Sequence, residues 1–246
     1  MNILITGGLT GIGNQLAYDY KMQGHKVAIV SFEDRKDIDP KILSDFSYYT
    51  ADVTNKDATS NAIRSFAEDA GSLDLVIANA GITMDKTTIP DFARGRKVID
   101  VNIVGTLNTF EPAIEIMKEQ GSGHLVGISS LSAYNGLPGM AIYGASKSFV
   151  MKFCESLALD LKQYGITVTT FAPGFIKTAM TENNRHKMPF MLTREQAAKI
   201  MRKAISDKRK VCAFPKPTFL LTSALHHMPR SAYRWVMDKD ILGLRK

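Results

Sequence analysis

The chain has 246 residues, 45% of them hydrophobic and 22% charged, which is typical of a globular protein with enough length for one large domain. Its formal net charge of +7 would indicate a nucleic-acid partner if the basic residues were clustered. They are dispersed, except at 208–210 and in the tail. The charge therefore favours an anionic small molecule and predicts no nucleic-acid partner. No export signal or apolar run of ~20 residues is present, and neither Cys154 nor Cys212 has metal or disulfide spacing, so we expect a reducing cytoplasm.

A predicted strand at residues 2–6 is followed by the glycine-rich sequence GGLTGIG and by a helical pattern that ends at Gly24. A second strand, at residues 26–32, completes a strand-helix-strand unit of about thirty residues, the length that dinucleotide binding requires. The glycines follow GxxxGxG rather than GxGxxG, but they too would let a pyrophosphate approach the backbone amides and the positive helix N-terminus. Taken alone, a plain tight turn explains this sequence equally well.

The end of the second strand gives a mixed signal about the cofactor. An acidic residue there would accept hydrogen bonds from free ribose hydroxyls, whereas a 2′-phosphate requires Arg or Lys. Ser31, Phe32 and Glu33 stand at this point, and Arg35 and Lys36 follow closely.

Strands and helices alternate through the rest of the chain. Further strands are predicted at residues 46–51, 73–78, 125–128, 166–172 and 211–214, with helices from about residue 55, over 92–119, up to Gly165 and over 193–205. Without repeats or linkers, residues 1–246 predict a single domain built on one doubly wound parallel sheet, Rossmann-like, of about seven strands with helices on both faces. Residues 179–192 mix polar residues with Met and Phe, which is typical of a mobile substrate lid or of a plain surface connection.

The stretch from Gly127 to Lys147 carries a hydroxyl, a phenol and an amine at fixed spacings. Ser130 follows a predicted strand, and Tyr143 and Lys147 are four residues apart, so they lie on one helix face. An ammonium placed there would lower the pKa of the phenol towards the working pH. A Tyr and a Lys at this spacing are also common on ordinary helix surfaces, so the pair needs its context.

That context resembles the short-chain dehydrogenase/reductase family over roughly residues 2–214. The motifs that carry the resemblance arrive in the family's order: TGGLTGIG at 6–13, Asp52-Val53, NAG at 79–81, Asn102, Ser130, YGASK at 143–147 and PGFIKT at 173–178. The family's chemistry implies an NAD(P)-dependent enzyme that interconverts an alcohol and a ketone or aldehyde.

The resemblance implies four catalytic roles. Tyr143 would be the general acid/base, and Lys147 would lower its pKa and bind the nicotinamide ribose. Ser130, thirteen residues before the tyrosine, would hold the substrate oxygen. Asn102 would sit at a helix irregularity and hold a water that links Lys147 to solvent.

The resemblance also implies a dinucleotide site without a metal. Besides Tyr143 and Lys147, the implied cofactor-binding residues are Gly7, Thr10, Gly11, Ile12 and Gly13 for the pyrophosphate, Ser31, Arg35, Asp52 and Val53 for adenosine, Asn79, Ala80 and Gly81 for the ribose, and Pro173, Gly174, Ile176 and Thr178 for the nicotinamide. NADP(H) is favoured over NAD(H), because Ser31 replaces the Asp of NAD-preferring relatives and Arg35 or Lys36 offers positive charge. Glu33 argues the other way.

The substrate is expected to be an apolar small molecule or lipid-like. The residues that suggest this are Gly136, Leu137, Pro138, Met140, Phe175, Met180, Met188 and Phe190. The alternatives are a sugar or sugar-nucleotide ketoreductase or epimerase, and a catalytically silent nucleotide-binding regulatory protein.

The tail, residues 215–246, predicts one or two amphipathic helices. We expect it to pack over the chain's own sheet edge or in a dimer interface; the alternative is a weak membrane-surface contact or a lipid entrance. A homodimer is favoured over a tetramer. His226 and His227 lack further ligands at a zinc spacing and are expected on the surface.

Overall fold

In the computed structural model, which describes residues 1–84, 89–182 and 190–240, seven strands form one parallel sheet in the order β3-β2-β1-β4-β5-β6-β7. The strands are β1 (Asn2–Thr6), β2 (Lys26–Ser31), β3 (Ser47–Thr50), β4 (Leu75–Ala78), β5 (Gly123–Ile128), β6 (Ile166–Pro173) and β7 (Val211–Phe214). The order reverses between β1 and β4, so the carboxyl ends of these two strands flank the position where ligands of doubly wound sheets bind. The predicted fold class is confirmed.

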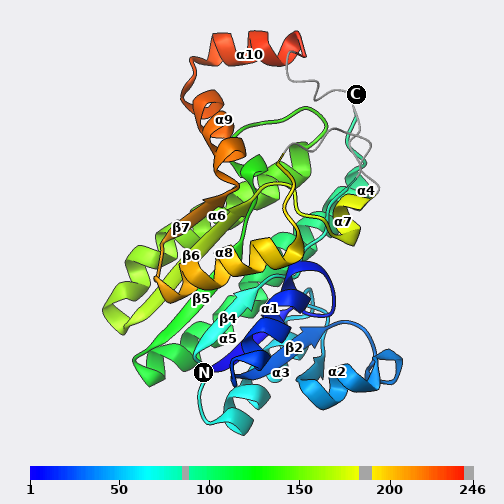
Figure 1. Ribbon diagram of the computed structural model, residues 1–246, viewed down its shortest axis with the longest axis vertical. Helices are drawn as coiled ribbons and strands as arrows, with labels where there is room; N and C mark the ends of the chain where they lie inside the picture. The colour runs from blue at the N-terminus through cyan, green and yellow to red at the C-terminus, as the bar shows by residue number, and fades with distance from the viewer. Residues whose placement is uncertain (85–88, 183–189, 241–246) are drawn as a thin grey trace.

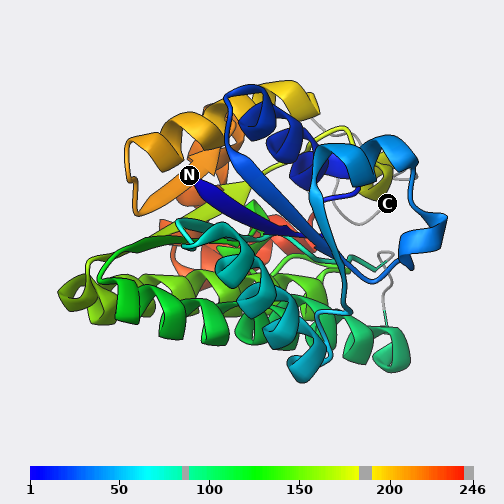
Figure 2. The same ribbon diagram turned by 90° about the horizontal axis from the view of Figure 1, so that it is seen from below.

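Helices cover both faces of the sheet (Figure 2). The helices α1 (Gly11–Met22) and α8 (Arg194–Ser206) lie on one face; α3 (Lys56–Ala70), α5 (Gly105–Gln120) and α6 (Ala141–Asp160) lie on the other. Successive strand residues serve opposite faces, since Ile3 and Ile5 pack with the α1 and α8 side whereas Leu4 packs with the other. Both faces are therefore buried, as expected for strands that read as continuous apolar runs.

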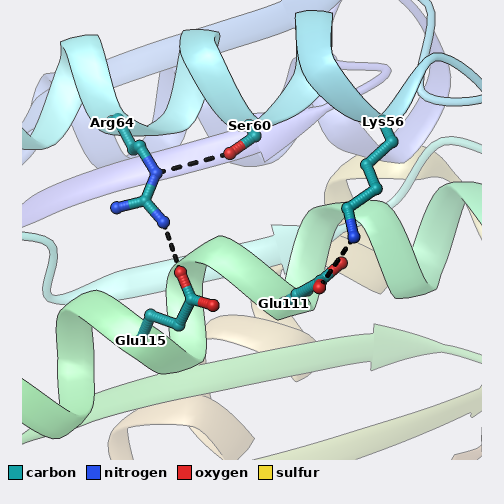
Figure 3. A network of polar contacts seen from close by, with 5 residues as sticks. All are labelled: Lys56, Ser60, Arg64, Glu111 and Glu115. Atoms are coloured by element: carbon teal, nitrogen blue, oxygen red, sulfur yellow. Dashed lines mark hydrogen bonds and ion pairs between the residues drawn. The ribbon is translucent and has the colours of Figure 1, made fainter.

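Ion pairs on the outer surface accompany the packing of α3 against α5 (Figure 3). Lys56 Nζ lies 2.9 Å from Glu111 Oε1, and Arg64 pairs with Glu115. All four side chains are about half exposed or more, so these pairs add little stability of their own. The apolar face beneath them carries the packing of the two helices.

Local sequence explains where several helices begin. Asn55 caps α3 by accepting a hydrogen bond from Ala58 N at 3.0 Å, and the predicted capping box of Thr193 and Gln196 is present at the start of α8. The predicted long helix over 92–119 is three segments, α4 (Phe92–Ile99), a π-helical segment η2 (Asp100–Val104) and α5. Asn102 lies within the π segment, so the expected helix irregularity is confirmed.

Short elements escaped the sequence-based prediction. Residues between β2 and β3 form the 3₁₀ turn η1 (Arg35–Asp37) and the six-residue helix α2 (Pro40–Asp45), which begin after the caps Asp34 and Asp39. They are too short to show a hydrophobic period. The remaining elements are η3 (Leu131–Ala133), η4 (Leu161–Tyr164) and α7 (Ala179–Glu182).

The tail forms two helices, α9 (Lys216–His227) and α10 (Arg230–Asp238), which continue beyond the carboxyl end of β7 (Figure 1). They pack on the loop that follows β5, where Asn135 Nδ2 donates to Thr222 O at 2.9 Å and the Tyr233 hydroxyl donates to Gly136 O at 2.5 Å. The tail therefore covers its own subunit, as expected. None of the helices in the described ranges has the length and apolar character to cross a bilayer.

Candidate active site

A cleft of about 1560 Å³ opens at the carboxyl edge of the sheet. It extends from the β1–α1 turn, across the ends of β2, β4, β5 and β6, to the inner side of α9. The predicted site residues that line it are Gly7, Thr10, Gly11, Ile12, Ser31, Asp52, Val53, Asn79, Ala80, Gly81, Ser130, Tyr143, Lys147, Pro173, Gly174, Ile176 and Thr178. Segments that are distant in sequence thus meet in one cleft, as the order of the motifs predicts.

The glycine turn provides room for a pyrophosphate. Gly7 has a φ of +65°, and a Cβ there would lie 2.9 Å from Ala80 Cα in the segment after β4. Gly11 has a φ of +60°, and the side chain of Thr10, the residue before α1, caps no backbone amide. Bare backbone at a helix N-terminus is a suitable cradle for an anion, so the site fits a dinucleotide.

Hydrogen bonds join the two strands at the switch point. Asn79 Nδ2 donates to Thr6 O at 3.1 Å and to Gly7 O at 2.9 Å, and the Thr6 hydroxyl accepts from Asn79 N at 3.1 Å. Gly13 does not line the cleft; a Cβ there would lie 2.4 Å from Asn79 Nδ2. Gly13 therefore serves the cradle indirectly, by leaving space for this amide.

Acidic rather than basic side chains face the adenosine end. Ser31 donates a hydrogen bond to the Glu33 carboxylate, and Glu33 and the exposed Phe32 line the cleft. Arg35 is not part of the lining; its Nη1 donates to Tyr48 O at 3.3 Å. Lys36 also lies outside the lining and pairs with Asp34 at 3.2 Å.

Tyr143 and Lys147 lie in the first two turns of α6 beside the end of β5. Lys147 is 6% exposed, its Nζ donates to Ile128 O at 3.0 Å, and it lies 5.9 Å from the centre of the Tyr143 ring. Burial lowers the pKa of Lys147 to about 8. Ser130 lies near Tyr143, where its side chain acts to lower the pKa of the phenol, and its Oγ accepts from Ser132 N at 3.2 Å.

The expected lowering of the Tyr143 pKa needs a correction. Burial raises the pKa of Tyr143, because the phenolate loses more hydration than the hydrogen bond with Ser130 restores. The Lys147 ammonium donates to Ile128 O and lies 5.9 Å from the centre of the Tyr143 ring. Tyr143 is therefore a phenol at neutral pH, and burial makes it a weaker acid than a free tyrosine.

Asn102 stands behind the cleft rather than in its lining. Its side chain is 1% exposed, accepts from Ile82 N at 2.9 Å and donates to Ile82 O and Ser146 Oγ, both at 3.0 Å. A Cβ on Gly81 would lie 3.2 Å from both Asn102 Oδ1 and Lys147 Nζ. Asn102 thus fixes the segment after β4 and the start of α6 around Lys147.

The other end of the cleft is mainly apolar. Of the residues expected there, Leu137, Pro138, Met140, Phe175 and Met180 line the cleft; Gly136 and Phe190 do not, and Met188 lies outside the described residues. In the expected lid, Ala179 to Thr181 line the cleft, and residues 183–189 are not described. Sequence reasoning gave the tail only as an alternative lipid entrance and named none of the α9 residues that form a wall of the cleft, which are Thr218, Leu221, Thr222 and Leu225. Their helical spacing was the available signal.

A doubly wound sheet with a cradle that fits a dinucleotide at its switch point, beside a half-buried tyrosine and a buried lysine, is the arrangement of a nucleotide-dependent oxidoreductase of the Rossmann type. The family model for short chain dehydrogenases matches residues 1–189. The chain belongs to this family, as the sequence motifs predicted.

Known proteins support the same class. The chain is 36% identical over 219 residues to an uncharacterized oxidoreductase of Myxococcus xanthus, with 86% of each chain covered. It is 32% identical over 186 residues to an acetoacetyl-CoA reductase of Allochromatium vinosum, covering 72% of this chain and 76% of that one. The solved structure of ElxO with NADP bound matches with a TM-score of 0.78 at 26% identity, covering 86% of this chain and 96% of that one. The protein is therefore an NAD(P)-dependent dehydrogenase/reductase that acts on CH-OH and C=O groups of small molecules.

Proposed function

We propose that this enzyme interconverts an alcohol and a ketone or aldehyde on a largely apolar small molecule, with Tyr143 as the general acid/base. The observation that carries the proposal is the placement of Ser130, Tyr143 and Lys147 between the dinucleotide cradle and the apolar end of the cleft. Tyr143 carries its proton near neutral pH, as a general acid in reduction requires, and the positive charge of Lys147 would offset its raised pKa in the transition state.

The proposed mechanism follows from these contacts. Ser130 donates a hydrogen bond to the carbonyl oxygen and holds it beside the Tyr143 hydroxyl. When bound in the cradle, NAD(P)H would supply the hydride for this reduction. The oxygen then takes the Tyr143 proton, and the nearby Lys147 ammonium stabilises the phenolate that remains. Asn102 holds the segments around Lys147 in position. Both hydrogens of Asn102 Nδ2 are already donated, so a water bound by Asn102 would have to donate to one of its oxygen atoms.

The test is a titration with NADH and NADPH, followed by turnover of a carbonyl panel monitored through cofactor fluorescence. Tight cofactor binding with turnover of apolar ketones or aldehydes is expected. Cofactor binding without turnover of any carbonyl would support a nucleotide-binding regulatory protein. Preference for sugars over apolar carbonyls would support the sugar ketoreductase alternative.

The proposed cofactor preference is NADP(H) over NAD(H). The NADP bound to the related ElxO supports it, and so does the lack of a carboxylate at position 31. The Glu33 carboxylate held by Ser31 opposes it. A 2′-phosphate would need the Arg35 side chain to exchange its bond with Tyr48 O for a bond with the phosphate.

The proposed assembly is a homodimer, and the proposed compartment is the cytoplasm, where two buried free thiols such as Cys154 and Cys212 persist. The outward sides of the tail support a weak membrane contact, because Leu220 and Trp235 are 66% and 59% exposed and Arg234 lies beside the tryptophan in sequence. Sedimentation with anionic liposomes tests this contact. Recovery of the protein in the supernatant at low salt would argue against it.

A further inference from the structure

Three buried oxygen atoms around the substrate end of the cleft have no hydrogen-bond partner. Within the described part of the chain, the buried side-chain atoms without a partner are Tyr20 Oη, Ser132 Oγ, Asn135 Oδ1 and Thr218 Oγ1. Tyr20 packs in the core with α1, whereas Ser132, Asn135 and Thr218 all line the cleft. Buried polar atoms in folded proteins are nearly always paired, so three exceptions around one cavity require an explanation.

The protein fixes the positions of these atoms. Ser132 follows Ser130 by two residues in η3, and its backbone N–H is tied to the Ser130 Oγ. Asn135 Nδ2 donates to Thr222 O at 2.9 Å, so the amide is oriented and Oδ1 is the atom left to accept. Thr218 lies one helical turn before Thr222 and shares its face of α9. The three oxygens thus come from one loop and from the helix hydrogen-bonded to that loop.

Their chemistry specifies a neutral hydrogen-bond donor. Asn135 Oδ1 can only accept, while the hydroxyls of Ser132 and Thr218 accept or donate. The charged residues of the described lining are Glu33, Asp52 and Lys147, which belong to the adenosine end and to the catalytic group. The apolar side chains of Leu137, Leu221 and Leu225 also line this end.

We propose that Ser132, Asn135 and Thr218 form a second polar subsite that binds a hydroxyl or amide N–H of the substrate. The substrate is then a hydroxylated or amide-bearing ketone or aldehyde on an otherwise apolar skeleton, rather than a plain hydrocarbon carbonyl. This inference rests on the proposed function, because it describes the substrate of the same site. A site with buried groups of this kind discriminates strongly against analogues that lack the matching donor.

The test compares carbonyl pairs that differ by one donor. Medium-chain ketones that carry a hydroxyl or an amide N–H at successive carbons are each paired with the plain ketone of the same skeleton. For one donor position, we expect the donor-bearing ketone to have a higher kcat/KM than the plain ketone. The ratio of these two kcat/KM values should fall roughly tenfold in Ser132→Ala and in Thr218→Val, which is the value of one uncharged hydrogen bond. Ser223→Ala, on α9 but outside the lining, is the matched control and should keep the preference.

A second readout is thermal unfolding without ligand. Both substitutions remove a buried hydroxyl that has no partner and retain the backbone N–H of Ser132, so their Tm should equal or exceed that of the wild type. Raised Tm with an unchanged substrate preference would mean that the oxygens bind water alone and would overturn the subsite. A wild-type enzyme that prefers the plain ketone at every donor position would also overturn the subsite. If no carbonyl is turned over, the proposed function fails, but the subsite can still be tested by ligand-induced shifts in Tm. A diol that raises the Tm more than its mono-alcohol does, with the difference lost in Thr218→Val, would support the subsite. Equal Tm shifts with the diol and the mono-alcohol would refute it.

Discussion

Burial changes the acidity of Tyr143 and Lys147 in opposite directions. It raises the pKa of the phenol and lowers that of the ammonium to about 8, so each group is shifted towards its neutral form. The two pKa values therefore move apart, so Tyr143 does not pass its proton to Lys147 in the resting site. Strongly shifted pKa values in a cleft are characteristic of acid/base sites.

Replacing Tyr143 with Phe should abolish turnover while preserving cofactor binding. The substitution removes the proton donor but keeps the ring, and loss of general acid catalysis typically costs ~10²- to 10⁴-fold in kcat. Tyr134→Phe is the control, since Tyr134 lies outside the cleft lining. Steady-state kinetics and a cofactor titration measure the two effects. Substantial residual activity in Tyr143→Phe would assign the proton to another group.

Replacing Lys147 with Met should stabilise the fold at neutral pH while reducing activity. The pKa falls from 10.5 to about 8, so burial of the ammonium costs up to about 3 kcal/mol below pH 8, partly offset by its bond to Ile128 O. The unfolded chain holds this proton between pH 8 and 10.5 while the folded protein releases it, so wild-type stability gains from this group as pH rises.

Urea unfolding at pH 7 and pH 10 measures this difference. Lys147→Met should lack the wild-type gain between the two pH values, and its excess stability should be largest at pH 7. In the wild type, the reductive kcat should decline as pH rises through about 8, where the ammonium loses its proton. A rise in stability of the same size in both proteins would contradict the assignment.

The proposed cofactor preference is tested at Arg35, Lys36 and Glu33. Arg35→Ala combined with Lys36→Ala should lower NADPH affinity about tenfold, or about 1.4 kcal/mol, and leave NADH affinity unchanged. Glu33→Gln should raise NADPH affinity, because it removes the carboxylate that repels a 2′-phosphate. Lys41→Ala on α2 is the matched surface control. Unchanged affinity for both cofactors in the double variant would exclude the proposed Arg35 contact.

At the scale of elements, the sequence predicted those with a long hydrophobic period or a motif. The sequence predicted the strands from their apolar runs, and it predicted α1, α3, α6 and α8 from apolar spacing over several helical turns. The glycine turn and YGASK indicated the position of the site. The rest depended on tertiary packing. Arg35 lies outside the cleft lining because it belongs to η1 and donates to a backbone oxygen of β3. The acidity of Tyr143 depends on its burial, which residue spacing does not show.

The π segment η2 should matter to both stability and catalysis, because Asn102 lies within it. Asn102→Ala leaves Ile82 N and Ile82 O without their side-chain partner, which should cost roughly 2 to 4 kcal/mol. Ser146 Oγ loses one bond and keeps its bond to Tyr143 O at 2.7 Å. Looser packing would admit water beside Lys147 and raise its pKa from about 8 towards 10.5. The decline of the reductive kcat should therefore move to higher pH.

The control for this variant is another buried asparagine. Asn108→Ala in α5 removes a bond of 2.8 Å from Nδ2 to Val53 O and should also lower stability. Because Asn108 does not brace the segment around Lys147, the pH of the decline should stay where it is in the wild type. The same shift in both variants would reduce Asn102 to a general contributor to stability.

At the scale of the molecule, the sheet and the tail contribute different parts of the cleft. The carboxyl ends of β1, β4 and β5 and the start of α6 carry the proposed cofactor-binding and proton-transfer residues, and α9 adds a wall from beyond the last strand. The sequence showed that the tail was amphipathic but left its partner open. The contacts of Asn135 with Thr222 and of Tyr233 with Gly136 decide that it covers its own cleft.

This arrangement leaves the outer side of α6 available for the proposed dimer. Leu159 is 71% exposed near the end of α6, and Phe149 and Phe153 stack with a ring distance of 5.5 Å earlier on the same helix. A two-fold interface would place Leu159 of each subunit in the contact, so Leu159→Glu would introduce two carboxylates at once. We expect light scattering to give a dimer for the wild type and a monomer for Leu159→Glu.

Leu220→Glu is the matched control for the dimer, because Leu220 is 66% exposed on α9, in the tail. It should remain dimeric, while its binding to anionic liposomes should fall if the tail touches membranes. Because Leu159 is already in contact with water in the monomer, its substitution should leave the Tm measured at low protein concentration within a few degrees of the wild type. A wild-type tetramer, or a Leu159→Glu variant that stays dimeric, would place the interface on another surface.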